Sequence, residues 1–337
     1  MRLDFYAPTR RPNHGAPLPP PPPGEPGVSP SAHGMQTIEA GSSSFAAAAR
    51  LFDKSTREST VMLYAWCRHC DDVIDGQQLG HGRRQSIQAD DSLRLAELER
   101  ATLRACFGEP DEDPVFAGLG EVVRRHRLPP ELLLEHLAGF RMDVDRARCE
   151  TLADTLLYCY RVAGAVGLMM ARVLGTRDPE TLDRACDLGI AFQLSNIARD
   201  VIEDAAVGRI YLPTQWLAEA GIPVDQIAEA VHRDALAAVV ARLVAAADPY
   251  YASAVSGIGA LPFRSAWSVA TARDVYRAIG RKVEQRGPRA WDERATTSSF
   301  AKAWFTVRGA LVAVAARRRV SDRRAENLWQ RPRRSGC

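Results

Sequence analysis

Residues 191–204 read AFQLSNIARDVIED, and this stretch carries the strongest signal in the chain. Its apolar residues recur at intervals of three and four, which is the period of one helix face and not of a strand. Asn196, Asp200 and Asp204 are each four residues apart, so they share one stripe of the predicted helix. Arg199 borders that stripe. The stretch therefore predicts a helix that presents a column of oxygen-bearing side chains beside a cation.

A second acidic stripe occurs at residues 67–76, which read CRHCDDVIDG. Asp71 and Asp75 lie four residues apart on one helix face, with Asp72 and Arg68 close by. Like charges at this spacing repel by roughly 0.2–0.5 kcal/mol per pair. Apolar residues are interleaved with the acids, which indicates that this helix also has apolar neighbours.

Carboxylates gathered near a protein core need cations, because an isolated buried charge is costly. Oxygen ligands without a matching set of His or Cys favour a hard ion: Mg²⁺, with Mn²⁺ as the alternative. Such an ion neutralises a diphosphate leaving group, and Arg68 and Arg199 can add charge-assisted hydrogen bonds to its oxygens. The residues alone thus favour a metal–diphosphate site over the alternative, a structural network of buried acids and arginines.

Departure of a diphosphate from an allylic carbon leaves a cation, which needs a dry pocket and aromatic faces. Five aromatic side chains are candidates, although each is also compatible with ordinary core packing: Tyr64, Tyr158, Tyr160, Phe192 and Tyr276. Tyr64 and Phe192 are favoured because each lies one turn from its acidic stripe.

Helical periodicity continues through most of the chain, and no convincing alternating strand or internal repeat occurs. The pattern predicts an all-α fold with helices near 42–52, 55–76, 90–106, 113–126, 130–146, 152–174, 179–205, 224–256, 263–286 and 299–319. Residues 1–34 are rich in Pro and Gly and are expected to be a disordered leader. Residues 35–319 then form one helical domain, and residues 320–337 form a basic tail that is either solvated or in contact with anionic lipid.

The composition is that of an ordinary folded protein: 337 residues, 46% hydrophobic and 25% charged, with a net charge of +3. Seven cysteines without a secretory signal predict reduced thiols in a cytoplasm. The lone pair Cys67 and Cys70 is weak evidence for zinc or redox chemistry. No uninterrupted apolar run reaches the ~18 residues of a membrane span, so none is expected.

Longer motifs connect these observations to a known family. The chain resembles the squalene/phytoene synthase family over about residues 41–332, in the stretches GSSSFAAAARLFD (41–53), YAWCRHCDDVIDG (64–76), YCYRVAGAVGLMM (158–170), AFQLSNIARDVIEDAAVGRIYLP (191–213), LPFRSAWSVATARDVYRAIGRKVEQ (261–285) and LWQRP (328–332). The resemblance implies a single all-α isoprenoid-synthase domain whose two acidic stripes face a central cavity.

The resemblance also implies roles for individual residues. Asp71 and Asp75 match the first metal-binding motif, and Asn196, Asp200 and Asp204 match the second. The four aspartates of these motifs and Tyr158 are expected to be catalytic. The expected substrate-binding residues are Arg68, Asp72, Gln193, Arg199, Tyr276 and Arg294. One position departs from the family, which usually has Ser-Lys-Ser-Phe where this chain has Ser42, Ser43, Ser44 and Phe45; the cation is missing at Ser43.

The implied reaction joins two geranylgeranyl diphosphates head to head, through prephytoene diphosphate, to give phytoene. It needs no NADPH, and no dinucleotide-binding fingerprint is present. Expected partners are the substrate, a membrane surface contacted peripherally from the cytoplasm and other carotenoid-pathway enzymes, but no nucleic acid. Two alternatives remain: a squalene or dehydrosqualene synthase that uses farnesyl diphosphate, and a non-catalytic assembly protein of the same fold.

Overall fold

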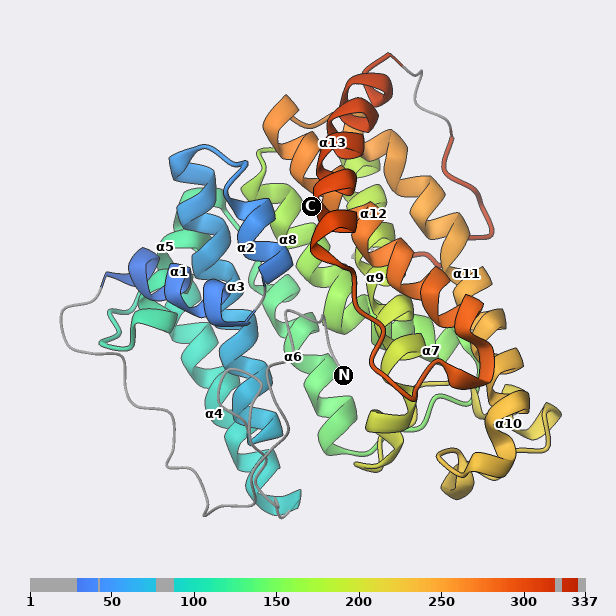
Figure 1. The fold of residues 1–337 in the computed structure, drawn as a ribbon. Helices are drawn as coiled ribbons and strands as arrows, with labels where there is room; N and C mark the ends of the chain where they lie inside the picture. Colours follow the sequence, from blue (N-terminus) through green and yellow to red (C-terminus); the bar gives the residue numbers. More distant parts are fainter. Residues whose placement is uncertain (1–28, 42, 77–87, 319–322, 333–337) are drawn as a thin grey trace. The chain divides into compact units, whose positions relative to one another are not determined.

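The computed structural model describes residues 29–41, 43–76, 88–318 and 323–332, and Figure 1 shows its helices. Of the described residues 76% are helical, and none lies in a strand. The predicted all-α class is therefore confirmed. The predicted disorder of residues 1–28 and the first residue of the helix predicted near 42–52 lie outside the described residues.

The helices divide between two compact units. The first unit, up to residue 145 and with residues 172–175, contains α1 (Pro30–Gly41), α2 (Ser43–Ala49), α3 (Lys54–Asp75), α4 (Gln88–Cys106), α5 (Pro114–His126) and α6 (Pro130–Val144). The second unit consists of residues 146–171 and of the chain from residue 176 onward. Its first elements are α7 (Leu152–Cys159), the π-helical turn η1 (Tyr160–Gly164), most of α8 (Ala165–Val173), α9 (Pro179–Ala205) and α10 (Thr214–Glu219). They are followed by η2 (Val224–Gln226), η3 (Ala230–His232), α11 (Arg233–Gly259), α12 (Phe263–Arg286), η4 (Gly287–Arg289) and α13 (Ser299–Ala316).

Local chemistry explains why most helices begin where the sequence predicts. The side chain of Asp178 accepts a hydrogen bond from the backbone N–H of Thr181, and Pro179 occupies the first helical position of α9. Thr151 and Asp154 form a reciprocal capping box at the start of α7. These interactions need only neighbouring residues, so they can be predicted from sequence alone.

One helix was not predicted, and another begins later than predicted. α1 precedes the first predicted helix altogether, and because it begins at Pro30 its first turn lies within the range expected to be a leader. It packs on α3 closely enough that a Cβ on Gly34 would come 2.7 Å from the carbonyl oxygen of Val61. The helix predicted at residue 224 begins instead at Arg233, because two separate 3₁₀ turns precede it.

α9 lies at the centre of the second unit and contacts η1, α11 and α12. Glycines allow its backbone to approach its neighbours: a Cβ on Gly189 would come 2.3 Å from the carbonyl oxygen of Ala163. A Cβ on Gly167 would come 2.4 Å from that of Ala185. This contact surrounds α9 with protein, so nearly every side chain in its central turns is buried.

The C-terminal segment 323–332 packs against the second unit, which corrects the expectation of a solvated or lipid-bound tail for these residues. Arg324 makes two hydrogen bonds of 2.9 and 2.6 Å to the carboxylate of Asp187, which is fully buried in α9. Arg331 pairs with Asp183 one turn earlier. The rings of Trp329 and Tyr160 are in contact, with centroids 4.9 Å apart and planes tilted at 37°. The segment docks because the buried carboxylates of α9 need cations.

This docking makes a stability prediction. Arg324→Ala leaves the Asp187 charge buried and uncompensated, so we expect the free energy of unfolding to fall by about 3–5 kcal/mol. The neighbouring pair of Arg323 and Glu326 is 89% and 82% exposed, and Arg323→Ala should change stability by less than about 0.5 kcal/mol. Urea denaturation followed by circular dichroism measures both. Equal losses in Arg324→Ala and Arg323→Ala would contradict this account. So would a double variant Asp187→Asn/Arg324→Gln whose free energy of unfolding is no higher than that of Arg324→Ala.

Candidate active site

The acidic stripe of α9 is buried. Asn196 and Asp200 are fully inaccessible to solvent, and Asp204 is 5% exposed. The Nε atom of Arg199 donates hydrogen bonds of 3.0 and 2.9 Å to the two carboxylate oxygens of Asp200. Arg294, which follows α12 in the chain, donates from Nε to Oδ1 of Asp200 at 3.1 Å. The structure thus brings together three residues that the sequence predicted as parts of one site.

The charges of this stripe are unevenly balanced. Burial raises the pKa of Asp200, but Arg199 and Arg294 outweigh that effect and lower it to about 2. Burial, with a further contribution from Asp200, raises the pKa of Glu203 to about 7. Burial also raises the pKa of Asp204 to about 6. At Asp200 the two arginines outweigh burial, whereas burial outweighs Arg294 at Glu203 and Arg209 at Asp204.

The oxygen atoms along the acidic stripe of α9 fit a hard cation. The Oδ1 atom of Asn196 is buried and accepts no hydrogen bond among the described residues, while its Nδ2 atom lies 3.5 Å from Oε1 of Gln193. Within the described residues, no three His, Cys, Asp or Glu side chains converge on one point. Mg²⁺ is commonly held by only one or two carboxylates, with substrate phosphates supplying further oxygens. The residues therefore fit a metal that binds together with a phosphorylated substrate.

The first acidic stripe lies on α3 in the other unit. Arg68 is 4% exposed and lies between two acids, 3.2 Å from Oδ2 of Asp71 and 3.3 Å from Oδ1 of Asp72. Asp75 is the last residue of α3, which ends at Gly76 with a left-handed φ of 60°. Residues 77–87, which follow, lie outside the described residues. As at Asp200, an arginine predicted to bind diphosphate is paired here with the acids of its own motif.

Aromatic side chains gather beside the stripe of α9. Phe192 stacks on Tyr276 of α12, with ring centroids 4.2 Å apart and planes at 20°. Tyr251 of α11 lies 6.3 Å from Phe192 and forms a hydrogen bond of 2.8 Å with Ser195. Phe192 and Tyr276 were candidates from the sequence; Tyr251 was not.

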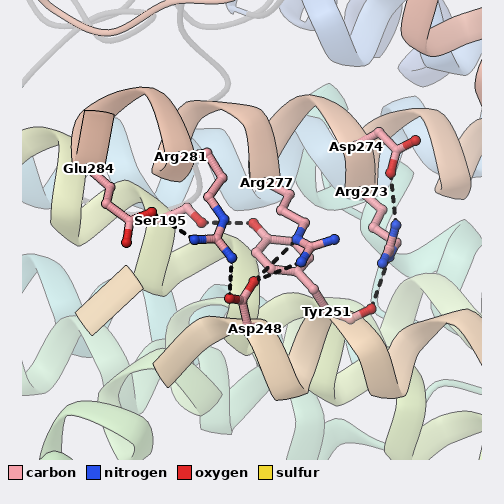
Figure 2. A network of polar contacts seen from close by, with 8 residues as sticks. All are labelled: Ser195, Asp248, Tyr251, Arg273, Asp274, Arg277, Arg281 and Glu284. Atoms are coloured by element: carbon pink, nitrogen blue, oxygen red, sulfur yellow. Dashed lines mark hydrogen bonds and ion pairs between the residues drawn. The ribbon is translucent and has the colours of Figure 1, made fainter. Parts of the chain in front are cut away.

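Arginines on α12 bind residues of α11 next to this aromatic cluster (Figure 2). Arg273 donates a 2.9 Å hydrogen bond to the carbonyl oxygen of Tyr251 and another to Asp274. Arg277 and Arg281, each one turn further on, both pair with Asp248 of α11. Sequence analysis assigned these residues no role, although the spacing of the three arginines already indicated one cationic face.

Tyr158 is fully buried near the end of α7, two residues before the first residue of the π-helical turn η1. Its ring stacks on that of Tyr211, with centroids 4.3 Å apart and planes at 19°. The hydroxyl of Thr155 donates a 2.8 Å hydrogen bond to the carbonyl oxygen of Tyr211, which fixes the pair. Single π turns inside α-helices frequently mark functional sites. Tyr211 lies within the motif GRIYLP but was not singled out from the sequence.

The side chain of Ser43, where the family usually has a lysine, lies outside the described side chains. All other predicted site residues are described. The second unit contains Tyr158, Gln193, Asn196, Arg199, Asp200, Asp204, Tyr276 and Arg294, and the first contains Arg68, Asp71, Asp72 and Asp75. Their catalytic and binding roles remain predictions.

Comparison with known proteins identifies the class. Residues 38–301 match the model of the squalene/phytoene synthase family. The chain therefore belongs to the squalene/phytoene synthase family, and it is a prenyltransferase.

Individual relatives narrow the comparison. Over 300 residues, the chain is 50% identical to a 15-cis-phytoene synthase of Pantoea ananas, covering 89% of this chain and 97% of the relative. It is 52% identical over 295 residues to a 15-cis-phytoene synthase of Enterobacter agglomerans, covering 88% and 100%. A solved dehydrosqualene synthase in complex with ligand matches with a TM-score of 0.76 at 28% identity, covering 85% of this chain and 97% of that structure.

The raised pKa of Glu203 makes a pH prediction for the metal-free protein. In the folded chain this pKa is about 7, above its ordinary value of 4.5. Between these values the folded state holds a proton that the unfolded state has released, so stability falls as pH rises through this window. Glu203→Gln should flatten that fall, as measured by thermal unfolding in EDTA. Glu219, which is 62% exposed and paired with Arg242, provides the control Glu219→Gln. Identical pH profiles for wild type and Glu203→Gln would contradict the prediction.

Proposed function

We propose that this chain is a phytoene synthase of carotenoid biosynthesis, which condenses two geranylgeranyl diphosphates through prephytoene diphosphate into phytoene. The observation that carries the proposal is the 50% identity to a 15-cis-phytoene synthase over nearly the full length of both chains. The buried carboxylates of α9 and the arginines beside them support it, because diphosphate departure requires charge neutralisation.

The proposal assigns a task to each part of the site. Asn196, Asp200 and Asp204 in one unit, and Asp71 and Asp75 in the other, would hold Mg²⁺, or Mn²⁺ as the alternative. When bound, the metal supplies positive charge to the leaving diphosphate.

The arginines of each unit would add charge-assisted hydrogen bonds to a substrate diphosphate. In the structure, Arg199 and Arg294 are paired with Asp200, and Arg68 is paired with Asp71. Binding would therefore transfer each guanidinium, in part, from a carboxylate to a phosphate oxygen, which would leave carboxylate oxygens available to hold the metal. Asp72 would help to hold Arg68, to which it is already paired.

The buried aromatic side chains would serve the allylic cation. Phe192 and Tyr276 present a stacked pair beside the acidic stripe, and Tyr158 is stacked on Tyr211. Ring faces stabilise cations and exclude water, which would otherwise trap the intermediate as an alcohol. Gln193, fully buried and one turn before Ile197, would orient the reacting chains.

The proposed reaction consumes no reductant. One diphosphate leaves as the first bond forms, and a proton leaves as the cyclopropane closes. The second diphosphate leaves before the rearrangement, and loss of a second proton ends the sequence. Each departing negative charge is matched by a cationic carbon that is later quenched by losing a proton, so no hydride donor such as NADPH is needed.

Farnesyl diphosphate is the alternative substrate. The match to a dehydrosqualene synthase favours it as the second candidate, but the 28% identity there is well below the 50% identity to a phytoene synthase. The oily substrates and product also support a cytoplasmic enzyme that contacts a membrane peripherally and passes its product to other carotenoid-pathway enzymes.

The proposal is tested by incubating the full chain with geranylgeranyl diphosphate and Mg²⁺, without NADPH, and identifying the hydrocarbon by chromatography. We expect phytoene and two diphosphates per product. A parallel incubation with farnesyl diphosphate is the control. Preferential turnover of farnesyl diphosphate would replace the proposed substrate, and turnover of neither would favour a non-catalytic role.

Substitution of the acids tests the assigned ligands. Asp200→Ala and Asp71→Ala should each reduce turnover by on the order of a hundredfold or more, because each removes charge stabilisation of the leaving group. Circular dichroism should remain helical. The exposed Asp225 provides a control in Asp225→Ala, which should retain wild-type turnover. Retained activity in both Asp200→Ala and Asp71→Ala would rule out the proposed ligand set.

A further inference from the structure

α13 carries an apolar stripe on its outer face. Along this helix the large apolar residues recur at intervals of three and four, and their exposed fractions are high: Phe300 85%, Trp304 58%, Val307 59%, Leu311 66% and Val314 43%. Scattered apolar residues are ordinary on a protein surface, but a continuous stripe on one helix marks an interaction surface.

The opposite face of α13 is fixed to the second unit. Ala313 and Ala316 are buried, and a Cβ on Gly309 would come 2.4 Å from the hydroxyl oxygen of Thr271 in α12. The indole N–H of Trp267 donates a 2.6 Å hydrogen bond to the carbonyl oxygen of Thr306. Figure 1 shows α13 beside α12.

The packing of α13 on its unit indicates that this helix lies on a membrane surface and does not cross the membrane. By length and hydropathy α13 is one of two described helices that could span a membrane, and only 17% of it is buried. Spanning would remove Ala313, Ala316 and the Trp267 hydrogen bond from their partners. Lying in the plane of the interface needs no such change, because the stripe already points outward.

The charges on α13 identify the partner. The helix and the next two residues contain no Asp or Glu, and they carry Lys302, Arg308, Arg317 and Arg318. Arg308 is paired with Asp274 of α12, whereas Arg317 and Arg318 are exposed at the C-terminal end of the stripe. The guanidinium of Arg317 lies 5.6 Å from the ring centroid of Phe263, another partly exposed apolar residue. An apolar stripe with Trp and flanking cations matches the boundary of an anionic bilayer.

The same charges disfavour parallel pairing with a second copy of this chain. Such pairing of two α13 stripes would bring the exposed Arg318 of one copy against Arg318 of the other, and no acid on the helix offsets that repulsion.

We propose that the outer face of α13 is the membrane-docking surface of this protein, lying in the interface of an anionic lipid bilayer with Phe300, Trp304, Val307 and Leu311 among the acyl chains. The biological purpose of this docking rests on the proposed function, whose substrates and product are lipids. It also moves the lipid contact away from the C-terminal tail, where Arg324 and Arg331 are paired with Asp187 and Asp183.

Flotation of the full chain with lipid vesicles tests the surface. Wild type should float with phosphatidylcholine vesicles that contain phosphatidylglycerol, and more weakly with pure phosphatidylcholine. Leu311→Asp and Trp304→Asp should each lower the bound-to-free ratio by about tenfold or more, since each removes one apolar side chain that the bilayer would bury. Arg318→Gln should lower the preference for phosphatidylglycerol by about fivefold, the loss of one charge near the surface.

Leu93 provides a matched control, because it is the same residue type on α4 and is also 66% exposed. Leu93→Asp should float as wild type does. Unchanged flotation of both α13 variants, or an equal loss in Leu93→Asp, would overturn the proposal. A wild-type dimer in analytical ultracentrifugation that Leu311→Asp dissociates, without vesicle binding, would overturn it in favour of a second copy.

Turnover in detergent separates this inference from the proposed function. With geranylgeranyl diphosphate in detergent micelles, Leu311→Asp should match wild type, because α13's outer face contributes no residue to the candidate active site. Vesicle binding by a wild-type protein that turns over no prenyl diphosphate would reject the proposed function and leave the docking surface standing. Turnover of geranylgeranyl diphosphate by a wild-type protein that does not bind vesicles would reject the docking surface and leave the proposed function standing.

Discussion

The structure depends on the burial of charged side chains along a single helix. α9 is surrounded by other helices of its unit, yet it carries carboxylates along its length. Removing a charge from water costs several kcal/mol, so each buried carboxylate needs a cation delivered to it. Segments distant in the chain provide these cations: Arg331 and Arg324 reach Asp183 and Asp187, and Arg294 joins Arg199 at Asp200.

The two halves of α9 solve this problem differently. In the N-terminal half, Arg324 and Ser253 both donate hydrogen bonds to Asp187, and the bond from Arg324 holds the C-terminal segment against α9. In the C-terminal half, Arg199 and Arg294 outweigh the effect of burial at Asp200, whereas burial keeps the pKa values of Glu203 and Asp204 raised. Natural proteins violate the rules of stability mainly at functional sites. Under the proposed function, a metal would add positive charge beside these two carboxylates.

Two stretches of similar hydropathy have opposite surroundings. Residues Leu152–Val173 and Ser299–Ala316 both pass a length and hydropathy test for membrane spans, but 72% of the first and 17% of the second is buried. The first packs on α9 through small residues such as Gly164 and Gly167. α13 packs through Gly309 on one side and leaves its large apolar residues outside. Hydropathy alone cannot separate these cases, because both helices have an apolar face and differ only in what covers it.

The sequence by itself determined the helical class, most helix boundaries and the acidic stripes. These depend on residues within one or two turns: Asp178 caps α9, and a spacing of four puts Asn196 and Asp200 on one face. Only the tertiary structure decided which arginine meets which acid, the stacking of Tyr158 on Tyr211, the docking of residues 323–332 and the exposure of α13. The physical reason is the separation in sequence between the residues that interact. Arg324 and Asp187 are separated by 137 residues, and no local pattern encodes a contact that exists only after the helices have packed.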